Sequence, residues 1–252
     1  MPQTPPFFII GGAPRSGTTW FYHALDRHPD LYMAKPVAPE PKFFLVDNRY
    51  RRGLDYYRKT WFSDAPAGCL SGEKSTNYLE SATAAQRIRE NLPDVRLIFI
   101  LREPCERAYS NYLWSRHHGK ETEDFKTALD LEEQRERELP EQLRFARPHA
   151  YFSRGLYARL LAPYFNLFPK KQIFCLKQAD IKTAPETALG RVHTFLGVPE
   201  RREDARNLGK INQIKDEEEY SMSDDVRKML RDRYAEANRE LVALLGPEFG
   251  DW

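Results

Sequence analysis

The stretch that decides the fold is Phe7-Phe8-Ile9-Ile10-Gly11-Gly12-Ala13-Pro14-Arg15-Ser16-Gly17-Thr18-Thr19-Trp20. It begins with four apolar residues, a composition that predicts a buried strand. Two glycines and a proline then break the strand, and the pattern that follows predicts a helix to Leu25. A helix N-terminus offers free backbone N–H groups and the positive end of the helix dipole, so this order of strand, turn and helix predicts a phosphate cradle.

The spacing of this loop is close to that of a nucleotide-binding loop. Gly12, Gly17 and Thr19 stand where G-x-x-x-x-G-K-[ST] has its glycines and its hydroxyl residue. Thr18 occupies the lysine position, and the cation of the loop is Arg15. Because that lysine reaches the β- and γ-phosphates in nucleoside triphosphatases, its absence indicates a different phosphorylated donor. The alternative is an ordinary strand–turn–helix whose glycines serve only the turn.

The letters P-R-S-G-T-T-W resemble the 5′-phosphosulfate-binding loop of sulfotransferases that use 3′-phosphoadenosine 5′-phosphosulfate (PAPS). The resemblance implies an α/β fold, with a P-loop-type central parallel β-sheet flanked by helices on both faces. It also implies that the donor binds at Arg15, Ser16, Gly17, Thr18, Thr19 and Trp20.

A second block, Pro39-Glu40-Pro41-Lys42-Phe43-Phe44, is predicted to be extended or turned because of its prolines. A carboxylate between two prolines is either a solvated loop acid or a positioned general base. E-P-K-F-F, after H-P-D at 28–30, resembles the heparan-sulfate-type sulfotransferases and their bacterial relatives. The resemblance implies that Glu40 is the catalytic base. Those relatives often have His where Lys42 stands, so this position departs from the pattern.

A third block, E-K-S-T-N-Y at 73–78, follows a predicted short strand. A lysine at the carboxyl end of a strand lies where open α/β sheets bind ligands. The block resembles the second active-site segment of the same family, and Lys74 matches its lysine. The resemblance implies that Lys74 and Arg15 neutralise the oxygen that bridges phosphate and sulfate.

The clearest buried strand, 95–101, leads into Arg102 and a helix that begins near Pro104. The spacing from Arg102 to Ser110 resembles the site that binds the 3′-phosphate of the donor in this family. An ion pair between Arg102 and a glutamate, Glu73 or Glu106, is the structural alternative. In the region 206–220, Lys210 is a candidate for closing over the donor, and Lys215 is another.

The segment 120–147 is heavily charged and is predicted to be a solvated helix or a mobile insertion, which could line the acceptor cleft. Ser223 is predicted to cap a long final helix that ends at Leu245. With no internal repeat and no linker composition, the sequence predicts one domain over residues 1–252.

Composition excludes several other classes of protein. The 252 residues are 41% hydrophobic and 30% charged, which indicates a globular chain, and a net charge of +2 argues against nucleic acid as a partner. Three scattered cysteines show neither metal spacing nor a disulfide framework. We expect reduced thiols, no signal peptide, no membrane span and a cytoplasmic location, with the oligomeric state open.

The sequence therefore favours a PAPS-dependent sulfotransferase that needs no metal and acts on a hydroxyl or amine of a carbohydrate or small metabolite. Two alternatives are a P-loop kinase of a small metabolite and a non-catalytic nucleotide binder. The missing lysine and the lack of a strand-end acid for Mg²⁺ count against the kinase. Glu40 and Lys74 count against the binder, because neither is needed merely to hold a nucleotide.

Overall fold

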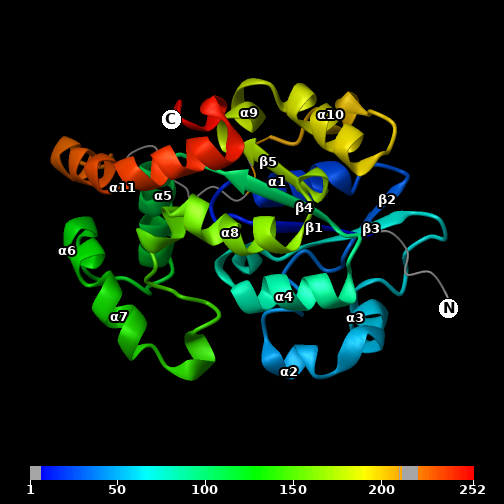
Figure 1. Cartoon of the computed structure of the whole chain (residues 1–252), viewed down its shortest axis with the longest axis horizontal. Helices are drawn as coiled ribbons and strands as arrows, with labels where there is room; N and C mark the ends of the chain where they lie inside the picture. The colour runs from blue at the N-terminus through cyan, green and yellow to red at the C-terminus, as the bar shows by residue number, and fades with distance from the viewer. Residues whose placement is uncertain (1–6, 210, 212–220) are drawn as a thin grey trace. The chain divides into compact units, whose positions relative to one another are not determined.

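The computed structural model describes residues 7–209, 211 and 221–252 (Figure 1). The chain divides into two compact units, each made of two stretches: unit 1 is Met1–Leu101 with Ala162–Asn212, and unit 2 is Arg102–Leu161 with Gln213–Trp252. One domain over residues 1–252 stays a prediction. None of the described helices is both long enough and apolar enough to cross a membrane.

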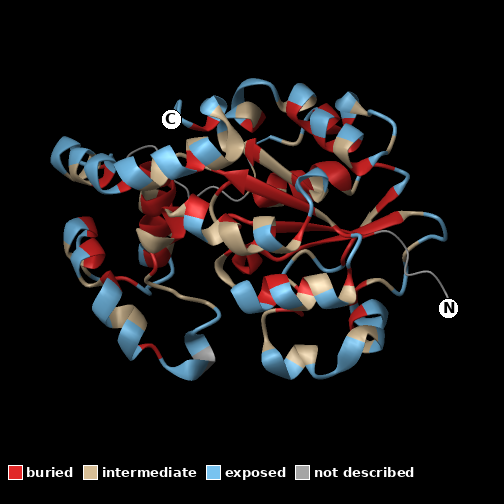
Figure 2. Ribbon diagram, in the orientation of Figure 1, coloured by how far each residue is buried: buried red, intermediate tan, exposed pale blue. Residues whose placement is uncertain are grey.

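Unit 1 is built on a five-stranded parallel sheet in the order β2-β3-β1-β4-β5. β1 is buried along its whole length and β4 from Leu97 onward, as Figure 2 shows, which explains the nearly continuous apolar sequences of these two strands. The predicted fold class is confirmed. The three-residue edge strand β2 was not predicted. The strands are β1 (Phe7–Gly12), β2 (Leu31–Met33), β3 (Leu70–Lys74), β4 (Arg96–Leu101) and β5 (Ile173–Lys177).

Helices cover both faces of this sheet, because alternate residues of each strand point to opposite sides. Ile10 and Ile98 pack into a core cluster with α1 and α10, whereas the ring of Phe99 packs edge-on against Tyr164. α9 is a helix that the sequence analysis did not predict. The α-helices that lie wholly in unit 1 are α1 (Thr18–Leu25), α2 (Asp47–Tyr50), α3 (Gly53–Trp61), α4 (Ala82–Asn91), α9 (Gln178–Thr183) and α10 (Pro185–Leu196), and a 3-10 helix, η1 (Thr76–Glu80), follows β3.

Unit 2 is helical in its described part. Its core joins Ala108 and Tyr112 of α5 to Phe125 of α6 and to Leu230 and Tyr234 of α11. The α-helices are α5 (Pro104–His117), α6 (Phe125–Asp130), α7 (Glu132–Glu138) and α11 (Asp224–Leu245), and α8 (Tyr157–Leu167) continues from unit 2 into unit 1.

The charged segment 120–147 contains a mostly solvated helix, as predicted, but it also contributes buried acids. It folds into α6 and α7, and two of its acids, Glu121 and Glu132, are buried. The carboxylate of Glu132 accepts the backbone N–H groups of Tyr151, Phe152 and Ser153 at 2.9, 2.6 and 2.9 Å. The other residues of α7 are exposed or half-buried, as predicted, and Glu132 is the exception because its burial satisfies backbone donors that would otherwise lack a partner.

Candidate active site

The loop between β1 and α1 has the geometry of an anion cradle. Gly17 has a φ of 86°, a left-handed conformation that turns the chain into α1. A Cβ there would also come 2.9 Å from Cδ1 of Ile181. Ser16 is fully buried, and its hydroxyl oxygen has no hydrogen-bond partner among the described residues. An orphaned hydroxyl beside the first N–H groups of a helix fits a bound anion that accepts from both.

Gly12 serves the packing of the site. A Cβ at this position would lie 2.7 Å from Cβ of Leu79 and 3.1 Å from the carbonyl oxygen of Thr76. Glycine therefore lets the end of β1 approach η1. The next residue ties the loop to β4, because the N–H of Ala13 donates to the carbonyl of Ile100 at 2.8 Å.

The structure brings Glu40 and Lys74 together. Lys74 Nζ lies 2.6 Å from Glu40 Oε1, and the N–H of Thr76 donates to Glu40 Oε2 at 3.2 Å. The Thr76 hydroxyl also lies 3.2 Å from both carboxylate oxygens. Lys42 Nζ is more distant, 3.9 Å from Oε2. β1 and β3 are parallel neighbours, and Ile10 is in register with Lys74. The Glu40–Lys74 pair therefore lies on the side of the sheet where the strands have their carboxyl ends, as the cradle does.

Glu73, one residue before Lys74, is fully buried and was not among the predicted site residues. Its Oε1 accepts the hydroxyls of Tyr57 at 2.8 Å and Tyr78 at 3.0 Å, and its Oε2 accepts the hydroxyl of Ser75 at 2.7 Å. Burial raises the pKa of Glu73 to about 7; the three hydroxyls oppose that rise, and the charge of Glu40 adds to it.

The predicted 3′-phosphate residues belong to unit 2. Arg102 follows β4, and its carbonyl accepts the hydroxyl of Tyr157 at 2.8 Å. Its guanidinium lies 3.9 Å from Glu106, so the alternative of an ion pair with that glutamate is partly realised. Ser110 is buried on α5.

Some of the predicted site residues lie outside the part of the chain that the structure describes. The loop candidates Lys210 and Lys215 lie outside the described residues. Among residues 7–209, 211 and 221–252, no group of three or more His, Cys, Asp or Glu is arranged to hold a metal ion.

Comparison with known proteins gives a consistent set of matches. The family described as "Sulfotransferase domain" matches residues 5–236. The chain is 30% identical to bifunctional heparan sulfate N-deacetylase/N-sulfotransferase 1 of Xenopus laevis over 95% of this chain and 30% of that protein. It is 27% identical to mouse heparan sulfate glucosamine 3-O-sulfotransferase 3B1 over 97% of this chain and 64% of the relative. The crystal structure of a sulfotransferase from Alicyclobacillus acidocaldarius is similar at a TM-score of 0.76 and 26% identity, covering 96% of both chains. The chain thus spans about a third of the N-deacetylase/N-sulfotransferase and about two thirds of the 3-O-sulfotransferase.

Proposed function

This chain belongs to the sulfotransferase family, and we propose that it transfers a sulfuryl group from PAPS to a hydroxyl or amine of a carbohydrate. The observation that carries the proposal is the Glu40–Lys74 pair, with 2.6 Å between its charged atoms, at the sheet edge that also bears the cradle. An acid, a cation and an anion site in this arrangement are the parts that transfer of an anionic group requires.

The donor would be held mainly by the cradle. The backbone N–H groups at 16–19 and the orphaned hydroxyl of Ser16 suit the 5′-phosphosulfate, and Arg15 adds a positive charge to the loop. Arg102 and Ser110 are proposed for the 3′-phosphate, and Lys210 for closure over the donor.

The chemistry assigned to the chain is a balanced in-line displacement. The acceptor oxygen or nitrogen forms a bond to sulfur while the bond from sulfur to the bridging oxygen breaks, and adenosine 3′,5′-bisphosphate leaves. Glu40 takes the acceptor proton. Lys74 has three N–H donors and uses one on Glu40, so another can stabilise the negative charge on the bridging oxygen.

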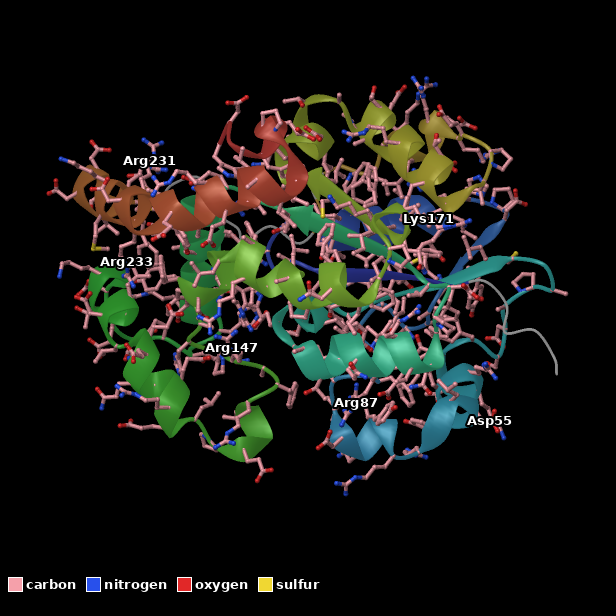
Figure 3. The ribbon with its side chains drawn as sticks, viewed as in Figure 1. Asp55, Arg87, Arg147, Lys171, Arg231 and Arg233 are labelled. Atoms are coloured by element: carbon pink, nitrogen blue, oxygen red, sulfur yellow. The ribbon has the colours of Figure 1, made fainter. Side chains whose placement is uncertain are left out.

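The donor assignment is tested by calorimetry without added metal. We expect adenosine 3′,5′-bisphosphate to bind more tightly than adenosine 5′-phosphate or ATP, and Arg102→Ala to remove most of that preference. One charge-assisted hydrogen bond contributes about 1.5–3 kcal/mol, or roughly 10–100-fold in affinity. Arg231→Ala, an exposed arginine on α11 labelled in Figure 3, is the control. Equal affinity for adenosine 3′,5′-bisphosphate and adenosine 5′-phosphate would contradict the assignment of Arg102 and Ser110 to the 3′-phosphate.

The acceptor class rests on the names of the relatives, which act on heparan sulfate. The test uses sulfur-labelled PAPS with three acceptors: a glucosamine polymer with free amines, the same polymer N-sulfated, and a simple phenol. Transfer to either polymer supports a carbohydrate acceptor and separates amine from hydroxyl transfer. Transfer to the phenol alone would contradict it.

A further inference from the structure

We propose that Glu73 is a positioning residue for Glu40, acting through two hydroxyl groups that hold the backbone of the loop on which Glu40 lies. The inference rests on the proposed role of Glu40 as the base. It assigns a task to a buried acid that has no contact with the cradle in the described structure.

Two hydrogen-bonded arms run from the Glu73 carboxylate to this loop. In the first arm, the Ser75 hydroxyl donates to Glu73 Oε2 at 2.7 Å and accepts the backbone N–H of Lys42 at 2.8 Å. In the second arm, the Tyr78 hydroxyl donates to Glu73 Oε1 at 3.0 Å and accepts the backbone N–H of Phe44 at 3.1 Å. The second arm is buried throughout, and in the first arm the bond from Ser75 to Glu73 is buried while the bond from Lys42 is partly buried.

The carboxylate fixes the direction of each arm. A hydroxyl has one proton and two lone pairs, and a carboxyl oxygen that carries no proton can only accept. Once Glu73 accepts the proton of Ser75 or Tyr78, the lone pairs of that hydroxyl face the loop and accept its N–H. An apolar residue at position 73 would leave both hydroxyl protons without their partner and would release this orientation.

The loop depends on such contacts because its own backbone has few. Pro39 and Pro41 carry no N–H, and the described structure assigns no helix or strand between β2 and α2. Two arginines hold carbonyls of the loop: Arg49 donates to Glu40 at 3.1 Å and also to Pro41, and Arg87 donates to Phe44 at 3.2 Å. Arg87 reaches from α4 towards α2, where Figure 3 labels it. The two arms supply the matching anchors for the N–H groups.

The two anchors control the position of the Glu40 carboxylate, because Glu40 precedes the anchored N–H groups of Lys42 and Phe44 by only two and four residues. Release of either anchor would let the carboxylate move relative to Lys74 and the acceptor. A displacement of about 1 Å in a catalytic group can lower turnover by as much as 10²-fold. We therefore expect loss of an arm to lower kcat and to leave donor binding unchanged.

The third donor to Glu73 offers a matched control. The Tyr57 hydroxyl donates to Glu73 Oε1 at 2.8 Å, and in the described structure it accepts no N–H from the loop. Its ring stacks on Phe43 at 4.6 Å between centroids, a contact that Tyr57→Phe preserves. Tyr57→Phe and Tyr78→Phe therefore remove the same kind of bond from the same oxygen, but only Tyr78→Phe frees a loop N–H.

The first measurement is amide hydrogen exchange on the unliganded protein, which needs no turnover. We expect Tyr78→Phe to speed exchange of the Phe44 N–H and Ser75→Ala to speed exchange of the Lys42 N–H, each by about 10-fold or more, as expected for loss of one hydrogen bond. Tyr57→Phe should leave both at the wild-type rate. Equal exchange in Tyr57→Phe and Tyr78→Phe would overturn the arms.

The second measurement is kcat, with the affinity for adenosine 3′,5′-bisphosphate determined on the same preparations. We expect kcat to fall about 10-fold in Ser75→Ala and in Tyr78→Phe and on the order of 10²-fold in the double variant, with unchanged affinity. We expect Glu73→Leu to lower kcat as well. Glu73→Gln keeps an acceptor for the tyrosines but offers Ser75 a donor in place of an acceptor, so it should rescue the part of that loss that comes from the Tyr78 arm. A kcat in Tyr57→Phe as low as in Tyr78→Phe would refute positioning, whereas wild-type protein without transferase activity would refute the proposed function instead.

Discussion

Glu73 in unit 1 and Glu121 in unit 2 are both buried carboxylates, but their pKa values are shifted in opposite directions. Both accept tyrosine hydroxyls: Glu73 from Tyr57 and Tyr78, and Glu121 from Tyr151 at 2.8 Å. Burial pushes both pKa values up, since a charged group is disfavoured away from water. The remaining partners decide the outcome.

Burial raises the pKa of Glu73 to about 7, because its hydrogen-bond partners are neutral hydroxyls and the charge of another acid, Glu40, adds to the rise. For Glu121, burial also raises the pKa, but the N–H of Glu123, the Tyr151 hydroxyl and the Arg135 guanidinium at 2.7 Å together outweigh it and lower the pKa. The sign of each shift thus follows the balance between burial, which raises both pKa values, and the hydrogen bonds and charges of the partners.

The difference separates two uses of a buried acid. Glu121 and its neighbour Glu132 close a network that holds the segment 120–154 in place. Glu73 lies in a network without a cation, which is less favourable for the fold but places hydroxyls against the loop of Glu40. The predictions below test this division, beginning with the largest expected effect.

Glu40→Gln should lower turnover by about 10²–10⁴-fold, the usual range for loss of a general base, with donor affinity unchanged. The amide keeps the volume and most hydrogen bonds of the carboxylate. Calorimetry and initial rates on one preparation measure the two quantities. An equal loss of turnover in Glu121→Gln would place chemistry in unit 2 and break the comparison.

Glu132→Ala should lower the free energy of unfolding by at least about 3 kcal/mol, because it strips three backbone N–H groups of their acceptor at about 1–3 kcal/mol each. Urea denaturation followed by fluorescence measures the change. The exposed neighbour Glu133→Ala is the control and should stay within about 0.5 kcal/mol of wild type. Similar free energies of unfolding for the two variants would show that the hydrogen bonds of Glu132 do not stabilise the fold.

Glu73→Gln should change how stability depends on pH. The native pKa of Glu73, about 7, exceeds its ordinary value of 4.5, so the native state holds the proton more strongly than the unfolded state. The contribution of Glu73 is therefore most favourable below pH 4.5 and is lost as pH rises to about 7. The variant should lack this decline, which amounts to about 3 kcal/mol at 1.36 kcal/mol per pKa unit.

Urea unfolding at about pH 5 and about pH 8 compares Glu73→Gln with wild type under the linkage relation. The variant should gain on the wild type at the higher pH. If the difference in the free energy of unfolding between variant and wild type is the same at both pH values, the pKa of Glu73 is close to its ordinary value. The contrast with Glu121 would then disappear.

Arg135→Gln should sharpen the comparison by giving Glu121 partners like those of Glu73. Without the guanidinium, burial is opposed by the hydrogen bonds and by the His149 ring 3.6 Å from Oε2, so the pKa of Glu121 should rise. Carbon NMR of the Glu121 carboxyl measures it. Lys126→Gln removes an exposed lysine that pairs with Asp130 at 3.0 Å and should leave that pKa unchanged. A Glu121 that still titrates low in Arg135→Gln would assign the shift to the backbone donors.

Much of the fold was predictable because its signals are local. The apolar run at 7–10 and the helix to Leu25 are contiguous signals, and they fold as β1 and α1. The predicted break at the two glycines was wrong by two residues, because Gly11 and Gly12 still belong to β1 and the loop begins after them. The same holds for the strand near 95–101, which folds as β4. The three-residue β2 and the short α9 are set by neighbouring strands and helices, so no periodicity in their own sequences identifies them.

The sequence by itself determined the fold class, the strand–loop–helix order at the cradle and the identity of Glu40 and Lys74 as candidates. Only the tertiary structure decided that Glu40 and Lys74 pair across 34 positions and that Glu73 supports the loop of Glu40. It alone also decided that Glu132 is buried although its segment is rich in charge. The physical reason is that an acid can be solvated, catalytic or structural in the same local sequence. Which of these it becomes depends on the donors that distant parts of the chain bring to it.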